Sequence, residues 1–193
     1  MYYPNKNIYC GKWVNNEFDG PGNFFYANNE RYEGSFSRGK RNGPGKYFYA
    51  NGDVFDGSWA NDLKRGRGIM IKANGDRFEG NYGEGGVEGG DGSYGYFYGN
   101  KYTGGYNMGM RSGMGQIDYY NGSKLQCAFR DDYAHGQGVM TYNNGDKYEG
   151  QFEGSEKSGV GIYTFSNGSR YEGGFRSDER NGVGTMVKAF VNK

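Results

Sequence analysis

Long apolar runs, cysteine and histidine are all scarce in this 193-residue sequence. Because no apolar run is long enough to cross a bilayer, the sequence predicts no transmembrane segment. Its start, MYYPNKN, has neither the apolar core of a signal peptide nor the Arg-rich pattern of a transit peptide. We therefore expect a cytoplasmic protein without a signal peptide.

A strong charge of one sign and helix-forming stretches are also missing. The formal net charge of +1 argues against a chain that neutralises nucleic acid along its length, so we expect no nucleic-acid partner. The 39 glycines disfavour helices, because each costs about 1 kcal/mol in a helix interior. Aromatic residues supply most of the large side chains, with 20 Tyr, 13 Phe and 2 Trp. This composition predicts an essentially all-β protein.

Residues for catalysis and metal binding are equally scarce. His135 is the only histidine, which excludes a second histidine-based site, and its place before Gly136 favours packing in a turn. The carboxylates recur at regular positions beside basic residues, which is typical of ion pairs rather than of an acid/base couple. Clusters of metal ligands are missing, and the Gly-x-Gly pairs have no following helix to make them phosphate loops. We expect no enzyme, no metal and no cofactor.

What the sequence does have is a repeat of 23 residues. Each unit opens with a Tyr-x-Gly-x-aromatic motif, which is followed eleven residues later by Gly-x-Gly. The units begin near Tyr9, Tyr32, Phe55, Phe78, Tyr102, Leu125, Tyr148 and Tyr171. A fixed period of this length indicates an array of supersecondary units that stack on their neighbours. We therefore expect a single elongated domain over residues 1–193.

The two cysteines, Cys10 and Cys127, lie five repeats apart. Two strands per repeat would separate them by on the order of 50 Å, which is too far for a disulfide. Two unpaired thiols suit a reducing compartment.

Each unit reads as one β-hairpin. Two short aromatic stretches flank a Gly-rich basic loop, and an Asn-Gly pair such as Asn51-Gly52 closes the unit, because such pairs tolerate the positive φ of tight turns. A two-residue turn would pair Phe48 with Phe55, whereas a three-residue loop would pair Tyr47 with Phe55. We favour the three-residue loop, since it gathers the aromatic rings on one face over paired glycines. The hairpins together predict an antiparallel meander of about sixteen strands in a single layer.

The aromatic face is the first candidate binding surface. Its rings either form only the core or also line a groove for a partner peptide. The groove residues would be Phe24, Tyr26, Tyr32, Tyr47, Tyr49, Phe55, Tyr119, Tyr142, Tyr148, Tyr163 and Tyr171.

The opposite face is the second candidate. It carries acidic residues such as Glu33, and we expect the basic residues at the position before each first aromatic, such as Arg31, on the aromatic side. The first three units also place four apolar residues on the opposite face: Phe25, Phe48, Ile69 and Ile71. Exposed apolar patches often mark contacts, so this patch is either a solvated surface or a contact for a partner or a second copy.

A basic cluster in the second and third units is the third candidate. It consists of Arg38, Lys40, Arg41, Lys46, Lys64, Arg65 and Arg67. Because the loops of successive repeats stack on one edge, we expect these charges to gather there. They would form a site that binds either anionic lipid headgroups or an acidic segment of a partner. The alternative is that they are simply basic residues of solvated loops.

Units such as YEGSFSRGKRNGPGKYFYANGD and YEGQFEGSEKSGVGIYTFSNGS resemble the MORN (membrane occupation and recognition nexus) repeat. The resemblance covers residues 9 to 193 and implies a twisted, elongated antiparallel sheet of about eight hairpins. Family members act as scaffolds in cilia and cytoskeletal structures, dimerise, hold peptides along a groove, or occur at membrane contacts. Two units depart from the pattern: the fourth has an extra residue in GEGGVEGGDG, and the sixth has Leu125 and Cys127 for the usual Tyr and Gly.

Together these features predict a non-enzymatic scaffold. It would be a structural subunit that binds partner proteins along its aromatic groove in a ciliary or other cytoskeletal assembly, as a homodimer or within a larger complex. The alternative is a membrane-associated adaptor that binds anionic phospholipid through the basic loops of the second and third repeats.

Overall fold

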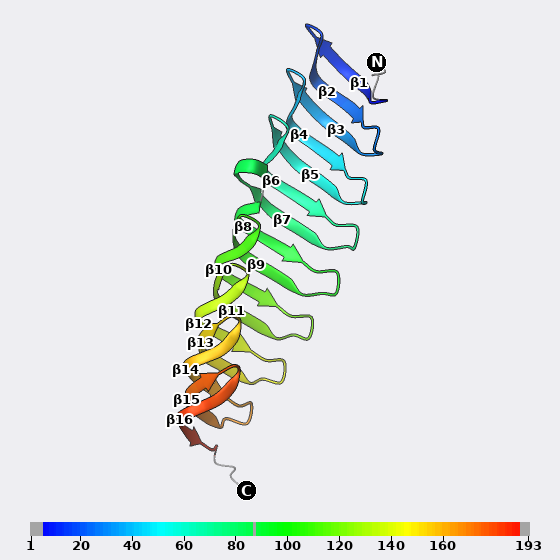
Figure 1. Ribbon diagram of the computed structural model, residues 1–193. Coiled ribbons are helices and arrows are strands. Elements are labelled where there is room, and N and C mark those ends of the chain that lie inside the picture. The colour runs from blue at the N-terminus through cyan, green and yellow to red at the C-terminus, as the bar shows by residue number, and fades with distance from the viewer. Residues whose placement is uncertain (1–5, 87, 190–193) are drawn as a thin grey trace. The chain divides into compact units, whose positions relative to one another are not determined.

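The computed structural model describes residues 6–86 and 88–189. Within these ranges the protein consists of sixteen β-strands in chain order and one short 3-10 segment, η1 (Glu84–Gly86) (Figure 1). Neighbouring strands pair antiparallel from β1 to β8 and from β9 to β16, and no helix of the described residues is long and apolar enough to cross a membrane. The prediction of an all-β, single-layer antiparallel meander is confirmed.

The chain divides into two compact units, Met1–Phe97 and Tyr98–Lys193. The first unit contains η1 and strands β1 (Ile8–Val14), β2 (Glu17–Phe25), β3 (Arg31–Ser37), β4 (Lys40–Phe48), β5 (Val54–Ala60), β6 (Leu63–Ile71), β7 (Arg77–Tyr82) and β8 (Glu88–Gly95). The second contains β9 (Lys101–Asn107), β10 (Met110–Asp118), β11 (Lys124–Arg130), β12 (Tyr133–Thr141), β13 (Lys147–Glu153), β14 (Glu156–Thr164), β15 (Arg170–Arg176) and β16 (Glu179–Val187). That the whole chain acts as a single domain stays a prediction.

The turn between consecutive repeats is the three-residue loop that strand parity favours. Tyr47 pairs with Phe55, and the amide of Tyr49 donates to the carbonyl oxygen of Asp53 at 2.9 Å. Gly52 closes the loop with a φ of 89°, a conformation that glycine adopts without a steric cost. The same parity is seen in the second unit, where Tyr163 pairs with Tyr171. The predicted register is therefore confirmed.

The core is a row of aromatic rings that lie over paired glycines. In β3 the ring of Tyr32 is fully buried, and its hydroxyl donates to the carbonyl oxygen of Ser35 at 3.0 Å. Gly34 and Gly45 face each other beneath this ring, and a Cβ on either would overlap it. The ring of Phe36 meets Tyr32 edge-on, with centroids 5.1 Å apart. Such contacts add about 0.5–1.5 kcal/mol per pair beyond burial, which helps a sheet without a second layer.

The sixth repeat replaces this arrangement with a smaller one. Leu125 and Cys127 are both buried, and the Cys127 sulfur lies over Gly138, where the ring would otherwise pack. Burial raises the pKa of the Cys127 thiol above its usual value. A leucine in place of tyrosine therefore leaves room for a thiol in place of glycine. Both Cys127 and Cys10 are free, as expected.

The charged face differs from expectation at one point. Arg31 forms an ion pair with Glu33 at 2.8 Å, and Arg77 forms one with Glu79 at 2.7 Å. Residues two apart on a strand point to the same side of a sheet. The basic residues before each first aromatic therefore lie on the charged face with their acidic partners, and placing them on the aromatic side was wrong.

Candidate functional site

A pocket opens on the aromatic face of the first unit, where β4, β5 and β6 meet η1. It encloses about 250 Å³. Its lining consists of Arg41, Tyr47, Tyr49, Trp59, Asp62, Leu63, Lys64, Gly85 and Gly86. We call it the first pocket.

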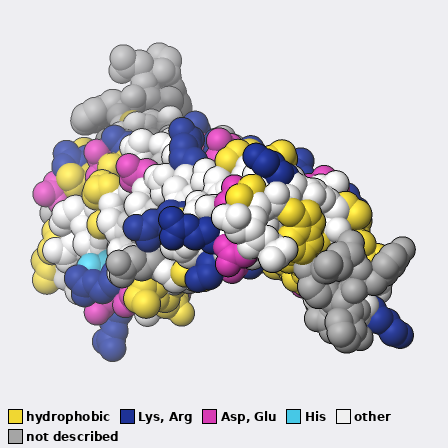
Figure 2. Space-filling view, turned by 90° about the horizontal axis from the view of Figure 1, so that it is seen from above, with side chains coloured by type: hydrophobic (Ala, Val, Ile, Leu, Met, Phe, Trp, Pro, Cys, Tyr) yellow, Lys and Arg dark blue, Asp and Glu magenta, His cyan; other side chains and the backbone are white. Residues whose placement is uncertain are grey.

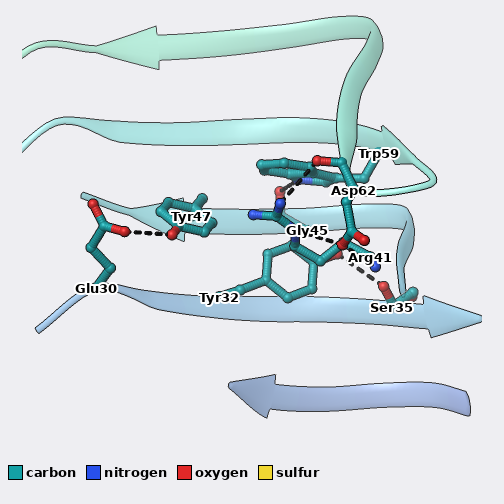
Figure 3. Close-up of polar contacts among 8 residues, drawn as sticks. All are labelled: Glu30, Tyr32, Ser35, Arg41, Gly45, Tyr47, Trp59 and Asp62. Carbon is teal, nitrogen blue, oxygen red and sulfur yellow. Dashed lines mark hydrogen bonds and ion pairs between the residues drawn. The ribbon is translucent and has the colours of Figure 1, made fainter. Parts of the chain in front are cut away.

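Arg41 is held in one position by the turn that follows β5. Its backbone amide and its Nε both donate to Oδ1 of Asp62, at 2.9 and 3.1 Å. Its Nη2 donates to the carbonyl oxygen of Asp62 at 2.9 Å, and its guanidinium lies 4.4 Å from the ring centroid of Trp59 (Figure 3). Trp59 is fixed in turn, because its Nε1 donates to the carbonyl oxygen of Gly45 at 3.0 Å. The guanidinium is thus a pre-positioned cation against an aromatic wall.

Lys64 is the second cation of the pocket and is the cross-strand partner of Trp59, in β6. Its ammonium is 5.3 Å from the ring centroid of Phe55 and 5.1 Å from that of Tyr82. No carboxylate of the described residues forms an ion pair with it. Burial is the main cause that lowers the pKa of Lys64. The charge of Glu88 acts in the opposite direction on that pKa, although it forms no ion pair with Lys64. Arg41 is therefore paired directly with a carboxylate, whereas Lys64 is not.

The opposite end of the aromatic face carries acidic residues. Glu30 accepts a hydrogen bond from the hydroxyl of Tyr47 at 2.7 Å (Figure 3). This bond is the main cause that holds the pKa of Glu30 below its usual value, while burial raises that of Tyr47. The next repeat places Asp53 at the same position, where it accepts from the amide of Ala73 at 2.9 Å. Glu30 and Asp53 thus lie at the opposite end of the aromatic face from Arg41 and Lys64, and Asp53 also pairs with Lys72 at 3.1 Å.

The second unit contains a pocket of the same design, which we call the second pocket. It encloses about 440 Å³ and is lined by Lys157, Tyr163, Phe165, Phe175, Asp178, Glu179 and Arg180. These seven occupy the same repeat positions as Arg41, Tyr47, Tyr49, Trp59, Asp62, Leu63 and Lys64. The amide of Lys157 donates to Oδ1 of Asp178 at 2.9 Å, as that of Arg41 does to Asp62. The same pocket design therefore occurs in both compact units, at the same positions of the repeat.

The acidic residues also make the stability of the fold depend on pH. Asp146 accepts hydrogen bonds from the hydroxyl of Tyr163 at 2.7 Å and from the amide of Ser166 at 2.8 Å, and these hold its pKa below the usual value. A carboxyl whose pKa is lower in the folded state stabilises the fold above its unfolded pKa of about 3.9, and this stabilisation is lost as the pH falls through the folded pKa.

We expect Asp146→Ser to reduce the loss of stability on acidification. Serine copies the natural arrangement at Ser123, whose hydroxyl accepts from the amide of Asn143 at 3.1 Å, so the turn stays tied. Urea midpoints measured between about pH 2 and 7 would show the difference. Asp131→Ser is the control, because Asp131 is an exposed turn residue of the same unit. An equal change in the two variants would contradict the role assigned to Asp146.

The proposed groove residues fall into three groups. Four of them form the core, with at most 8% of each side chain exposed, because their rings lie over the glycine pairs: Tyr32, Phe55, Tyr148 and Tyr171. Three of them line the pockets: Tyr49, Tyr163 and Tyr47, the last of which is itself buried, with 7% exposed. The others are half-buried on the same face: Phe24, Tyr26, Tyr119 and Tyr142. The core rings are thus out of reach of a partner, and the rest stay candidates.

The seven basic residues do not gather on one surface. Lys46 pairs with Asp56 at 3.0 Å and Arg67 with Glu79 at 3.6 Å, so both lie on the charged face. Arg41 and Lys64 lie over rings of the aromatic face, whereas Arg38 and Lys40 line a hollow at the β3–β4 turn, and Arg65 is exposed. The cause is side-chain alternation, which sends neighbouring residues to opposite faces. Figure 2 likewise shows basic side chains interspersed with acidic and apolar ones on the visible surface.

The predicted apolar patch is partly assembled. One cross-strand row of the charged face runs through Phe25, Arg31, Phe48, Val54 and Ile71. Ile69 lies in the adjoining row, between acidic residues, and the guanidinium of Arg31 covers the ring of Phe48 at 3.6 Å. Three of the four predicted residues are thus in line. Their role as a contact for a partner or a second copy stays a prediction.

The cations of the pockets were not predicted from the sequence. A basic residue recurs at the tenth position of five of the 23-residue repeats: Arg41, Lys64, Arg111, Lys157 and Arg180. An aspartate follows 21 residues after three of them, at Asp62, Asp132 and Asp178, and forms an ion pair with each. That recurring spacing was visible in the sequence and could have identified the paired cations.

Comparison with known families gives a match over most of the chain. The model described as MORN repeat matches residues 9–31, 32–54, 55–77, 102–124, 128–147, 148–170 and 171–189. These are seven of the eight repeats that the 23-residue period predicts. The fourth, with its extra residue, is unmatched but still forms the hairpin of β7 and β8. Comparison with curated proteins gives no match.

Solved structures share the fold at low sequence identity. A mutant of the TCP10 domain of Danio rerio CPAP is 10% identical with a TM-score of 0.53, covering 90% of this chain and 81% of that one. The SAS-4 (dCPAP) TCP domain of Drosophila melanogaster, solved in complex with a proline-rich motif of Ana2, is 16% identical with a TM-score of 0.46. That match covers 76% of this chain and 84% of that one. The similarity to the Danio rerio domain supports the single-layer antiparallel fold of this chain.

Proposed function

The chain belongs to the MORN repeat family, and from this premise we propose that it is a non-enzymatic scaffold that binds a partner protein along its aromatic face. The assembly that we propose for it is ciliary or otherwise cytoskeletal, and this part of the proposal rests on what the family implies. A homodimer or a larger complex would use the same scaffold.

The observation that carries the proposal is the pocket that occurs in both units. In each, a cation is fixed by the aspartate of the next turn and lies beside aromatic rings that are still partly open to solvent, such as Tyr49 and Phe165. Fixed aromatic rings and fixed charges lose little conformational freedom on binding, which favours recognition of a peptide. Tyr and Trp rings are also enriched among residues that dominate binding energy.

A protein-capture experiment tests this function. We expect the double variant Tyr49→Ser and Phe165→Ser to lose the partners that the unchanged protein retains from cell extract in mild salt, as identified by mass spectrometry. Both residues are half-buried, so the variant should stay folded, which its thermal unfolding would verify. Tyr120→Ser is the control, since that ring is 76% exposed in a turn. Full retention of the same partners by the folded double variant would contradict the proposal.

Binding to anionic membranes is the alternative, and the geometry supports it less. An anionic surface attracts basic residues that face it together, at about 1 kcal/mol each. Here Lys46 and Arg67 face away from Arg41 and Lys64. Sedimentation with phosphatidylserine vesicles would decide the matter. Strong binding that is abolished by charge reversal at Lys40, Arg41, Lys64 and Arg65 would favour the membrane.

A further inference from the structure

The two pockets have the same frame but different electrostatics. The first pocket has two cations, Arg41 and Lys64, and one acid, Asp62. At the position between Asp62 and Lys64 it has Leu63, where the second pocket has Glu179. Among the residues that line each pocket, the charges of the second are therefore balanced, and those of the first leave one positive charge in surplus. Glu88 lies outside this lining and interacts with Lys64 electrostatically without an ion pair.

Two hydrogen-bond donors of the first pocket are unused. Nε and Nη2 of Arg41 bind Asp62, but Nη1 makes no hydrogen bond with a described residue. The ammonium of Lys64 likewise has no acceptor there. Arg41 and Lys64 are both partly buried, and an anion between the two donors would form charge-assisted hydrogen bonds with each.

The size and walls of the first pocket indicate what kind of anion fits. Its volume of about 250 Å³ is below the 300–1,000 Å³ usual for pockets that take a drug-sized ligand. The walls beside the cations are the rings of Tyr49 and Trp59, and the pocket is open on one side. It suits one side chain of a longer segment whose neighbouring apolar residues lie on the rings.

We propose that the first pocket binds a carboxylate side chain, Asp or Glu, of an extended partner segment, flanked by apolar residues. This inference rests on the proposed function and names the chemistry of its partner. The carboxylate lies between Nη1 of Arg41 and Nζ of Lys64. The second pocket takes a side chain without a negative charge, because Glu179 would repel one.

Selection from a displayed library of random twelve-residue peptides, with the full chain as bait, tests the inference. We expect the peptides that depend on Tyr49 to share one acidic residue beside apolar ones. A synthetic copy of an enriched peptide should bind the unchanged protein at least tenfold more tightly than it binds Lys64→Glu, as measured by fluorescence polarisation. Replacing its acid by the matching amide should weaken binding to the unchanged protein and remove the difference between the two proteins.

Two further variants keep the test independent of folding. Leu63→Glu gives the first pocket the charge of the second at a side chain that is 51% exposed, and it should weaken the same peptide. Lys40→Glu, which changes the charge by as much as Lys64→Glu but at the neighbouring turn outside the pocket, is the control and should leave binding within about twofold, since exposed charges are screened by salt.

The outcomes separate the inference from the function on which it rests. Tyr49-dependent peptides without a shared acid, or with equal affinity for the unchanged protein, Lys64→Glu and Leu63→Glu, would overturn the inference and leave the scaffold function standing. If no selected peptide depends on Tyr49, the proposed function itself fails, and the inference fails with it.

Discussion

Replacing Trp59 by alanine is expected to lower the free energy of unfolding by about 3–5 kcal/mol, the usual loss for a large aromatic residue in a core. Only 5% of Trp59 is exposed, and its indole meets Tyr32 and Phe55 edge-on, with centroids 5.4 and 5.3 Å apart. The change also removes the hydrogen bond to Gly45 and the ring against which Arg41 lies. Urea unfolding followed by circular dichroism would measure the loss.

The chain contains a matched control for this change. Trp13 occupies the same repeat position in β1, but 37% of it is exposed, and its ring contacts are with Tyr9 and Phe18. Trp13→Ala should cost clearly less, because less apolar surface is removed from the core. Equal losses for the two variants would show that burial and ring contacts do not set the contribution of this position.

The second large effect is expected from Gly57→Ala. A Cβ at Gly57 would lie 2.7 Å from Cα of Gly68 and 2.7 Å from Cζ of Phe55. The first of these is backbone and cannot move aside without shifting β6, so overpacking should cost about 1–3 kcal/mol. Chemical denaturation would measure the cost through a lower midpoint.

Gly95→Ala is the matched control for Gly57→Ala. Gly95 also lies in a strand, and a Cβ there would have only one neighbour, the carbonyl oxygen of Arg77 at 3.9 Å. We expect its midpoint to change little. A loss at Gly95 as large as at Gly57 would attribute the effect to the general cost of a side chain in these strands, and not to the ring over the glycine pair.

The fold was predictable because its signals are local and repeated. The period fixed the number of hairpins, and strand parity alone distinguished the pairing of Tyr47 with Phe55 from that of Phe48. The aromatic face over paired glycines followed from the same parity. These features depend on residues within one or two units of each other, which a sequence shows directly.

The candidate site was predictable only in part, because it depends on the face of the sheet toward which each charged side chain points. Tyr47 and Tyr49 were identified, but Arg41 was assigned to a basic loop and is instead drawn over the rings by Asp62 from the next repeat. Counting charges along the chain ignored the alternation that sends Lys46 to the other face. A cluster in sequence was therefore not a cluster in space.

The turns between repeats carry a consequence for how such a protein can change its length over evolution. The side chain two residues before the first position of a repeat accepts a hydrogen bond from the next turn: Glu30 from Ala50, Asp53 from Ala73, and Ser123 from Asn143. Gain or loss of a whole 23-residue repeat preserves every such link, whereas insertion of part of a repeat at the turns between repeats would break one. The extra residue of the fourth unit lies at the other end of its hairpin, near η1, and the link from Asp76 to Phe97 persists at 2.9 Å. This architecture therefore tolerates the duplication of whole repeats, and it tolerates shorter insertions only at the end of the hairpins where η1 lies.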